Sequence, residues 1–223
     1  MIRWAHFETI TSFARGHTAT TAVIGFVAGV MVWGAFNWSL EISNTETFCI
    51  SCHVMKENPW PEYRKTRHYA NRTGVRASCP DCHVPREWIH KVVRKVRATG
   101  ELYHWLIGSI DTREKFEARR PFLAEQVWAS MVATDSRECR NCHGIESMAA
   151  EAQTPGAYAM HQLAAAWEKT CIDCHQGIAH DPPREFDADD VMDALHDRMD
   201  DEKIECELCH EKMGRPPPGD DWD

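Results

Sequence analysis

All ten cysteines of the chain lie in five Cys-x-x-Cys-His runs, which limit its fold more than any other feature. In a haem c attachment sequence of this kind, two thiols bond the vinyl groups of one haem and the following histidine binds its iron. A thioredoxin motif does not need that histidine, and a zinc ribbon would leave it unexplained. The predicted attachment residues are Cys49, Cys52, Cys79, Cys82, Cys139, Cys142, Cys171, Cys174, Cys206 and Cys209, and the predicted proximal ligands are His53, His83, His143, His175 and His210.

Five covalently bound haems would also explain how so polar a chain can fold. Hydrophobic residues make up 43% of the chain, but they concentrate in one N-terminal segment. The remainder cannot bury a large core of side chains, so we expect the porphyrins to supply the apolar surface. No run of alternating β-branched residues stands out. The predicted fold class is therefore all-α with extensive coil, a multihaem cytochrome c with one transmembrane helix.

The N-terminal apolar segment is predicted to be a membrane anchor. No charged residue lies between Arg15 and Glu41, and residues 19–38 are long enough to span a bilayer as a helix. Arg3 and Arg15 precede this segment, which places the N-terminus in the cytoplasm. A cleaved signal peptide is the alternative, but its apolar region would be shorter. Both interpretations put the cysteines on the periplasmic side of a bacterial inner membrane.

The motifs after the anchor form a repeat. Cys49 and Cys79 begin motifs 30 residues apart, and Cys139 and Cys171 begin motifs 32 residues apart. The two pairs indicate a duplicated di-haem unit, joined by helices expected over 87–98 and 113–132. The predicted division is a cytoplasmic N-terminus at 1–18, an anchor at 19–40, a four-haem domain at 41–182 with repeats at 45–110 and 135–182, and a C-terminal module with the fifth haem at 183–223.

Each iron needs a sixth ligand, and the remaining histidines on the periplasmic side supply the candidates. His68 and His161 lie between the motifs of the two halves, and His90 and His180 follow the second motif of each. Bis-histidine ligation would give low-potential haems suited to electron transfer. For the first haem, Met55 is a candidate ligand, or it packs against the porphyrin.

The C-terminal module is strongly acidic. Residues 181–223 carry 16 acidic and 5 basic side chains, so the rest of the chain has a net charge of +2 by difference from −9. A short acidic helix is expected over 187–202, and its His196 is the predicted distal ligand of the fifth haem, with Met199 and Met213 as rivals. The charge either keeps the module soluble or docks it onto a basic partner. We expect the end of the chain, with prolines at 216–218, to be extended or disordered.

Several long motifs resemble the NapC/NirT family of membrane-bound multihaem cytochromes. The resemblance covers roughly residues 15–182 and is carried by residues 49–55, 68–76, 79–85, 135–143 and 170–180. It implies one anchor, a tetrahaem periplasmic domain, and electron transfer from menaquinol or ubiquinol to a periplasmic reductase. The fifth motif departs from the tetrahaem form and is similar to that of the TorC-type pentahaem relatives, which have a much longer C-terminal domain.

The resemblance also implies a quinol site close to the first haem. By position, its lysine and acidic residue would be Lys95 and Glu101. His104 is a further candidate, either as a base or as an iron ligand. The basic residues around them could instead bind anionic lipid head groups.

The sequence therefore predicts a quinol dehydrogenase that relays electrons to a periplasmic reductase or soluble cytochrome. One alternative is a relay subunit of a larger respiratory complex, and another is electron flow from the periplasm to quinone. Membrane lipid and the quinol pool are expected partners, and nucleic acid is not. Gly25 and Gly29 form a Gly-x-x-x-Gly pair that could join two anchors.

Overall fold

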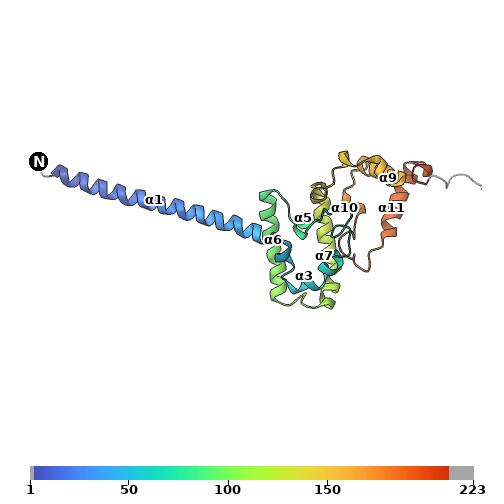
Figure 1. The fold of residues 1–223 in the computed structure, drawn as a ribbon, viewed down its shortest axis with the longest axis horizontal. Helices are drawn as coiled ribbons and strands as arrows, with labels where there is room; N and C mark the ends of the chain where they lie inside the picture. The colour runs from blue at the N-terminus through green and yellow to red at the C-terminus, as the bar shows by residue number, and fades with distance from the viewer. Residues whose placement is uncertain (1–2, 211–223) are drawn as a thin grey trace, which may run out of the picture.

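One long helix projects from a small helical domain (Figure 1). The computed structural model describes residues 3–210, and the side chains of residues 18–210. Helix α1 spans Arg3–Ile42, and its part from Thr18 to Ile42 is long and apolar enough to cross a membrane. No residue of the most apolar window is buried against the protein. Most of the predicted anchor at 19–40 therefore exposes apolar side chains that an apolar medium would have to cover.

The domain consists of short helices and loops, and no strand occurs between residues 3 and 210. This agrees with the predicted all-α class. After the anchor come α2 (Glu46–Cys49), α3 (His53–Glu57), α4 (Pro59–Tyr63), α5 (Cys79–His83), α6 (Trp88–Leu106), α7 (Arg113–Ala133), α8 (Arg137–Arg140), η1 (Ile145–Ser147), η2 (Ala150–Ala152), α9 (Pro155–Ala166), α10 (Cys171–Cys174), α11 (Ala188–Asp201) and η3 (Cys206–Leu208).

Helix α6 is longer than the sequence pattern indicated. The expected helix ended at residue 98, but α6 continues through Gly100 to Leu106. A glycine inside a helix costs only about 1 kcal/mol. An ion pair between Arg94 Nη2 and Glu101 Oε1, 2.9 Å apart, spans the glycine and offsets part of that cost. The other predicted linker helix, 113–132, corresponds closely to α7.

The base of the anchor is fastened to the start of α6. Trp88 Nε1 donates a hydrogen bond to Asn37 Oδ1 over 2.9 Å, and the rings of Trp88 and Trp33 lie 5.4 Å apart. One turn further along, Lys91 Nζ lies 2.7 Å from Glu41 Oε1. These contacts fix where the anchor leaves the domain.

Few hydrophobic side chains are buried in the described part of the chain. One cluster joins Trp167, at the end of α9, to Leu195 and Met199 of α11. The expected acidic helix is thus present, and two of its apolar residues pack against the second half of the domain. The sparse packing agrees with the expectation that the side chains alone do not build the core.

A buried ion pair joins distant parts of the domain. Arg120 of α7 donates to both carboxylate oxygens of Glu62 of α4, at 3.0 and 2.6 Å, and the two side chains are 9% and 5% exposed. Arg120 also bonds both oxygens of Glu117. The Asp181 backbone completes the network, because its carbonyl accepts from Arg120 and its N–H donates to Glu62. The charges are therefore compensated within the protein.

Replacing Arg120 by alanine should destabilise the protein by about 3–5 kcal/mol, because Glu62 would remain buried without its cation. The matched control is Arg113→Ala, which removes a 68% exposed side chain lying 3.8 Å from the same Glu117. That change should cost no more than about 0.5 kcal/mol. Urea unfolding followed by far-ultraviolet circular dichroism measures both values. Equal losses in the two variants would contradict a structural role for the buried pair.

Candidate functional site: paired histidines around the cysteine motifs

Two of the cysteine motifs lie on short helices held by the same capping arrangement. Asp81 Oδ2 accepts from the backbone N and the hydroxyl of Ser78 over 2.7 and 2.6 Å. Asp173 Oδ2 accepts from the equivalent groups of Thr170 over 2.7 and 2.8 Å. Each is a capping box that fixes the helix on which both cysteines lie. The pattern Ser/Thr-Cys-x-Asp-Cys-His in the sequence carries the signal for this capping box.

Four motif histidines face a second imidazole at nearly the same distance. The ring centroids lie 6.2 Å apart for His68 and His143, 6.1 Å for His83 and His180, 6.1 Å for His161 and His175, and 6.4 Å for His196 and His210. A metal lies about 2 Å from an imidazole nitrogen, which is roughly 1.1 Å from its ring centroid, so two rings on one iron have centroids roughly 6.3 Å apart. The observed separations match that value.

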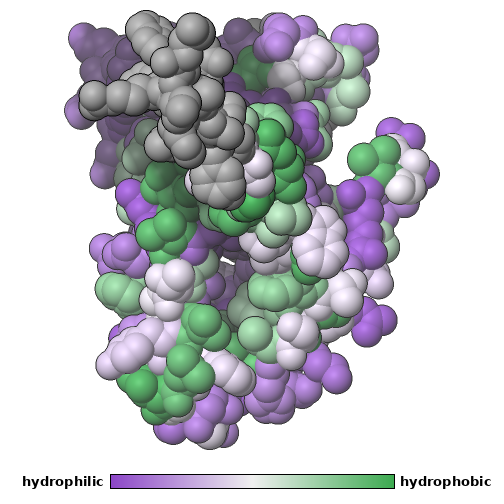
Figure 2. All heavy atoms as spheres, turned by 90° about the vertical axis from the view of Figure 1, so that its left-hand side faces the viewer, coloured by the Kyte–Doolittle hydropathy of each residue, from purple (hydrophilic) through white to green (hydrophobic). Residues whose placement is uncertain are grey.

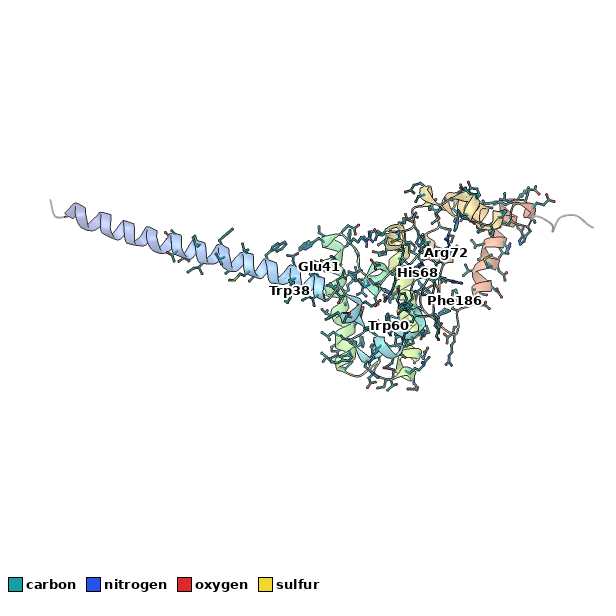
Figure 3. The ribbon with its side chains drawn as sticks, viewed as in Figure 1. Trp38, Glu41, Trp60, His68, Arg72 and Phe186 are labelled. Carbon is teal, nitrogen blue, oxygen red and sulfur yellow. The ribbon has the colours of Figure 1, made fainter. Side chains whose placement is uncertain are left out.

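Two of the four pairs connect the two halves of the internal repeat. His68 comes from the first half and faces His143 of the second, while His180 follows the last motif of the second half and faces His83 of the first. The other two pairs are local. Figure 3 shows His68 in the middle of the domain, far from Trp38 and Glu41 on the anchor.

The His83–His180 pair borders an open pocket, and the residues that line this pocket test whether a haem c fits the site. Its lining includes Cys79, Cys82, His83 and His180, so both thiols of the second motif and two opposed imidazoles converge on one space. These are the groups that a covalently bound, bis-histidine haem needs.

Burial favours the neutral form of three of these imidazoles, those of His83, His180 and His175. It lowers the pKa of His83 to about 4, and it also lowers the pKa of His180 and His175. A neutral imidazole has the lone pair that binds a metal.

The first motif lacks such a pair. His53 is exposed, and no imidazole of the described residues faces its ring. Met55 is half-buried and lines the pocket of the second motif, together with Cys49 of its own motif. The structure therefore places Met55 between the first two motifs.

The structure does not bring His90 to any motif. His90 is exposed near the start of α6, and its ring pairs with no other histidine of residues 18–210, whose side chains the structure describes. In the internal repeat, His90 corresponds to His180. The two residues differ in surroundings because the second motif of the first half leads into the long helix α6, whereas the second motif of the second half leads into a loop.

The predicted quinol residues Lys95, Glu101 and His104 all belong to α6, but they lie at different heights along its axis. The charges of Lys95 and Glu101 both act on the Cys49 thiol, and Lys95 Nζ donates to the Ser43 carbonyl over 2.6 Å. Burial lowers the pKa of Lys95. His104 instead bonds Ser109 through Nδ1, at 2.8 Å. His104 lies nine residues beyond Lys95, or about 13 Å along the helix axis, so the structure does not group it with Lys95.

The fifth motif is docked against the second half of the domain. A Cβ added to Gly156 of α9 would lie 3.2 Å from the Cys209 carbonyl, so α9 and η3 are in close contact. Trp167 Nε1 also donates to Glu202 over 2.8 Å. Of the rival ligands, Met199 packs in the Trp167 cluster, and Met213 lies outside the described residues, as do the prolines at 216–218.

A family model described as the NapC/NirT cytochrome c family, N-terminal region, matches residues 13–185. The Denitrification system component NirT of Stutzerimonas stutzeri is 58% identical over 168 residues, covering 75% of this chain and 84% of the relative. The Cytochrome c-type protein NapC of Escherichia coli strain K12 is 49% identical over 180 residues, covering 81% and 88%. The Cytochrome c-type protein TorY of Escherichia coli O157:H7 is 43% identical over 146 residues, covering 65% and 40%. No solved structure matches the chain.

Proposed function

Since this chain belongs to the NapC/NirT cytochrome c family, a membrane-anchored group of haem c proteins in anaerobic respiratory electron transfer, we propose that it is a five-haem quinol dehydrogenase. The family assignment supports a single anchor in the inner membrane and a periplasmic haem domain. The number of haems, their ligands and the quinol site are our proposal. The four imidazole pairs spaced as for a shared iron are the observation that carries it.

In this proposal, the two histidines of each pair would hold one iron. His143, His83, His175 and His210 would be proximal, and their partners would be His68, His180, His161 and His196. Met55 is the candidate for the first iron. When bound, haems so ligated supply one-electron transfer between neighbouring porphyrins and leave no coordination site open to substrate.

Replacing His161 by alanine should convert about one haem equivalent from low-spin to high-spin, because His175 would lose its opposite ligand. Electronic absorption and electron paramagnetic resonance of the oxidised protein measure the change. His90→Ala is the control, since His90 is exposed and faces no motif histidine. A low-spin spectrum in His161→Ala, or a high-spin signal in His90→Ala, would contradict the ligand assignment.

The fifth haem is supported by geometry beyond the matched family region. The family match ends at residue 185, before the motif at Cys206. His196 on α11 nevertheless faces His210 with nearly parallel rings, 20° apart. This geometry supports the proposal that α11 carries a ligand as well as charge.

The double variant Cys206→Ala, Cys209→Ala should lose one haem, because no thiol would remain to hold a porphyrin at the fifth motif. A pyridine haemochrome assay should fall from five equivalents per chain to four, with a mass decrease of one haem. The single variant Met192→Ala, on the preceding helix α11, should retain five. Four equivalents in the unaltered protein would contradict the proposed count.

Quinol oxidation is proposed at the first motif, which lies close to the membrane end of the domain. Cys49 follows the end of α1 at Ile42 by only a few residues, so the first attachment site is close to the base of the anchor. Lys95 and Glu101 are the charged groups that act on Cys49 from α6. They would be close to a quinol arriving from the outer leaflet.

Conversion of a quinol to a quinone releases two protons and two electrons, so the site needs groups that hold and accept protons. Lys95 would donate a hydrogen bond to one ring oxygen, and burial, which lowers its pKa, favours the neutral amine that can accept one of the two protons. Glu101 is 63% exposed, so a proton that it accepts can pass to the periplasmic water.

The electron acceptor is proposed to be a periplasmic reductase or a soluble cytochrome. The acidic α11 and the fifth motif lie at the end of the domain farthest from the anchor (Figure 1). A basic partner could approach there without meeting the membrane. Pairing of two anchors through Gly25 and Gly29 remains a prediction, and both glycines are exposed.

Replacing Lys95 by methionine should slow reduction of the protein by menadiol in proteoliposomes by about 100-fold or more, because one proton-handling group is lost. Lys95→Arg should restore part of the rate, and exposed Lys65→Met should leave it unchanged. Stopped-flow absorption measures the rates, and chemical reduction by dithionite should remain normal in all variants. A wild-type rate in Lys95→Met would contradict the proposed site.

A further inference from the structure

Helix α6 carries an apolar face that nothing in the described part of the chain covers. Ile89, Val93, Val96, Tyr103 and Ile107 are 44–68% exposed. At 100° per residue they fall within an arc of about 80°, so they form one stripe that extends one residue past the end of the helix. A continuous exposed stripe of this kind marks a binding surface rather than scattered surface residues.

The opposite face of α6 is bonded to the domain. Lys91 reaches Glu41, Arg94 Nε donates to the His83 carbonyl over 3.2 Å, and Lys95 reaches the Ser43 carbonyl. These polar contacts fix the rotation of the helix about its own axis. The apolar stripe must therefore point away from the domain.

The position of α6 identifies the surface that the stripe meets. The helix lies across the direction of α1, at the end of the domain from which the anchor projects (Figure 1). Figure 2 looks at this end and shows hydrophobic residues gathered from the anchor toward the lower edge. The stripe and the anchor thus belong to the same end of the molecule.

The first turn of α6 also carries interfacial side chains. Trp88 lies against Trp33 and Phe36 of the anchor, with ring centroids 5.4 and 6.4 Å apart. Tryptophan concentrates at the boundary between hydrocarbon and head groups. Exposed His90 and Arg97 border the stripe, where a basic side chain can reach anionic head groups.

We propose that α6 is an interfacial helix lying in the plane of the membrane, with the stripe of Ile89, Val93, Val96, Tyr103 and Ile107 immersed in the outer leaflet. The occupant of this surface is lipid. The domain is then held to the membrane at two places, by the anchor and by α6. The two attachments together fix the orientation of the domain relative to the bilayer. The proposal does not depend on quinol oxidation.

Thiol labelling tests this proposal in the full-length haem protein. Wild-type protein, whose motif cysteines are blocked by haem, provides the blank. Val93→Cys and Val96→Cys are treated with a membrane-impermeant maleimide in spheroplasts and in proteoliposomes of phosphatidylethanolamine and phosphatidylglycerol. Met192→Cys is the matched control, since Met192 and Val93 are both 44% exposed and Met192 lies on α11 at the opposite end. Each rate is divided by the rate of the same variant unfolded in dodecyl sulfate.

Cysteines at 93 and 96 should react about tenfold or more slowly than Cys at 192 in both membranes, because a thiol in lipid neither ionises nor meets the reagent. Equal rates at all three positions would overturn the proposal. Protection in spheroplasts that is lost in proteoliposomes would assign the stripe to a protein partner and overturn it. Protection that appears only at a high protein-to-lipid ratio would assign it to a second copy, with the same consequence.

Discussion

The constant separation of four imidazole pairs is the constraint on which the rest of the domain depends. Few side chains of the described residues are buried, so packing alone does not fix the path of the backbone. The positions of the histidines relative to the cysteine motifs fix it instead. Two pairs, His68 with His143 and His83 with His180, join the halves, and neither half could therefore complete these sites alone. These two pairs join the halves of a loop-rich chain into one folded unit. With iron bound, each pair would add coordination bonds between the halves, which are stronger than a hydrophobic contact.

The Arg120–Glu62 network shows how the protein supports one of these pairs without iron. Its last members are the N–H and carbonyl of Asp181, the residue directly after His180. The backbone that carries His180 is thus tied to α4 and α7 by buried, charge-assisted hydrogen bonds. Because both side chains are almost fully buried, neither charge can lose its partner without a large penalty. The Arg120–Glu62 pair therefore fixes the position of the backbone next to His180 as well as contributing to the stability of the fold.

The two ends of the domain differ in the surfaces they present. At the anchor end, α6 has polar contacts on its inner face and an apolar stripe on its outer face, and Lys95 lies close to the first motif. At the far end, acidic α11 is fastened by Trp167, Leu195 and Met199. Such a difference suits the proposed relay between the membrane and a periplasmic partner, because apolar surface associates with lipid and charge steers a protein partner.

The sequence by itself determined the chemistry: five Cys-x-x-Cys-His motifs, an anchor, an all-α chain and the histidines His68, His161, His180 and His196 as ligand candidates. These are local properties, set by spacing and composition. Tertiary structure decided which histidine faces which motif, left His90 without a paired ring and separated His104 from Lys95. It also revealed the Arg120–Glu62 pair, whose members are 58 residues apart. The physical reason is that opposed ligands and buried ion pairs join residues distant in the chain, and periodicity along the chain carries no record of distances through space.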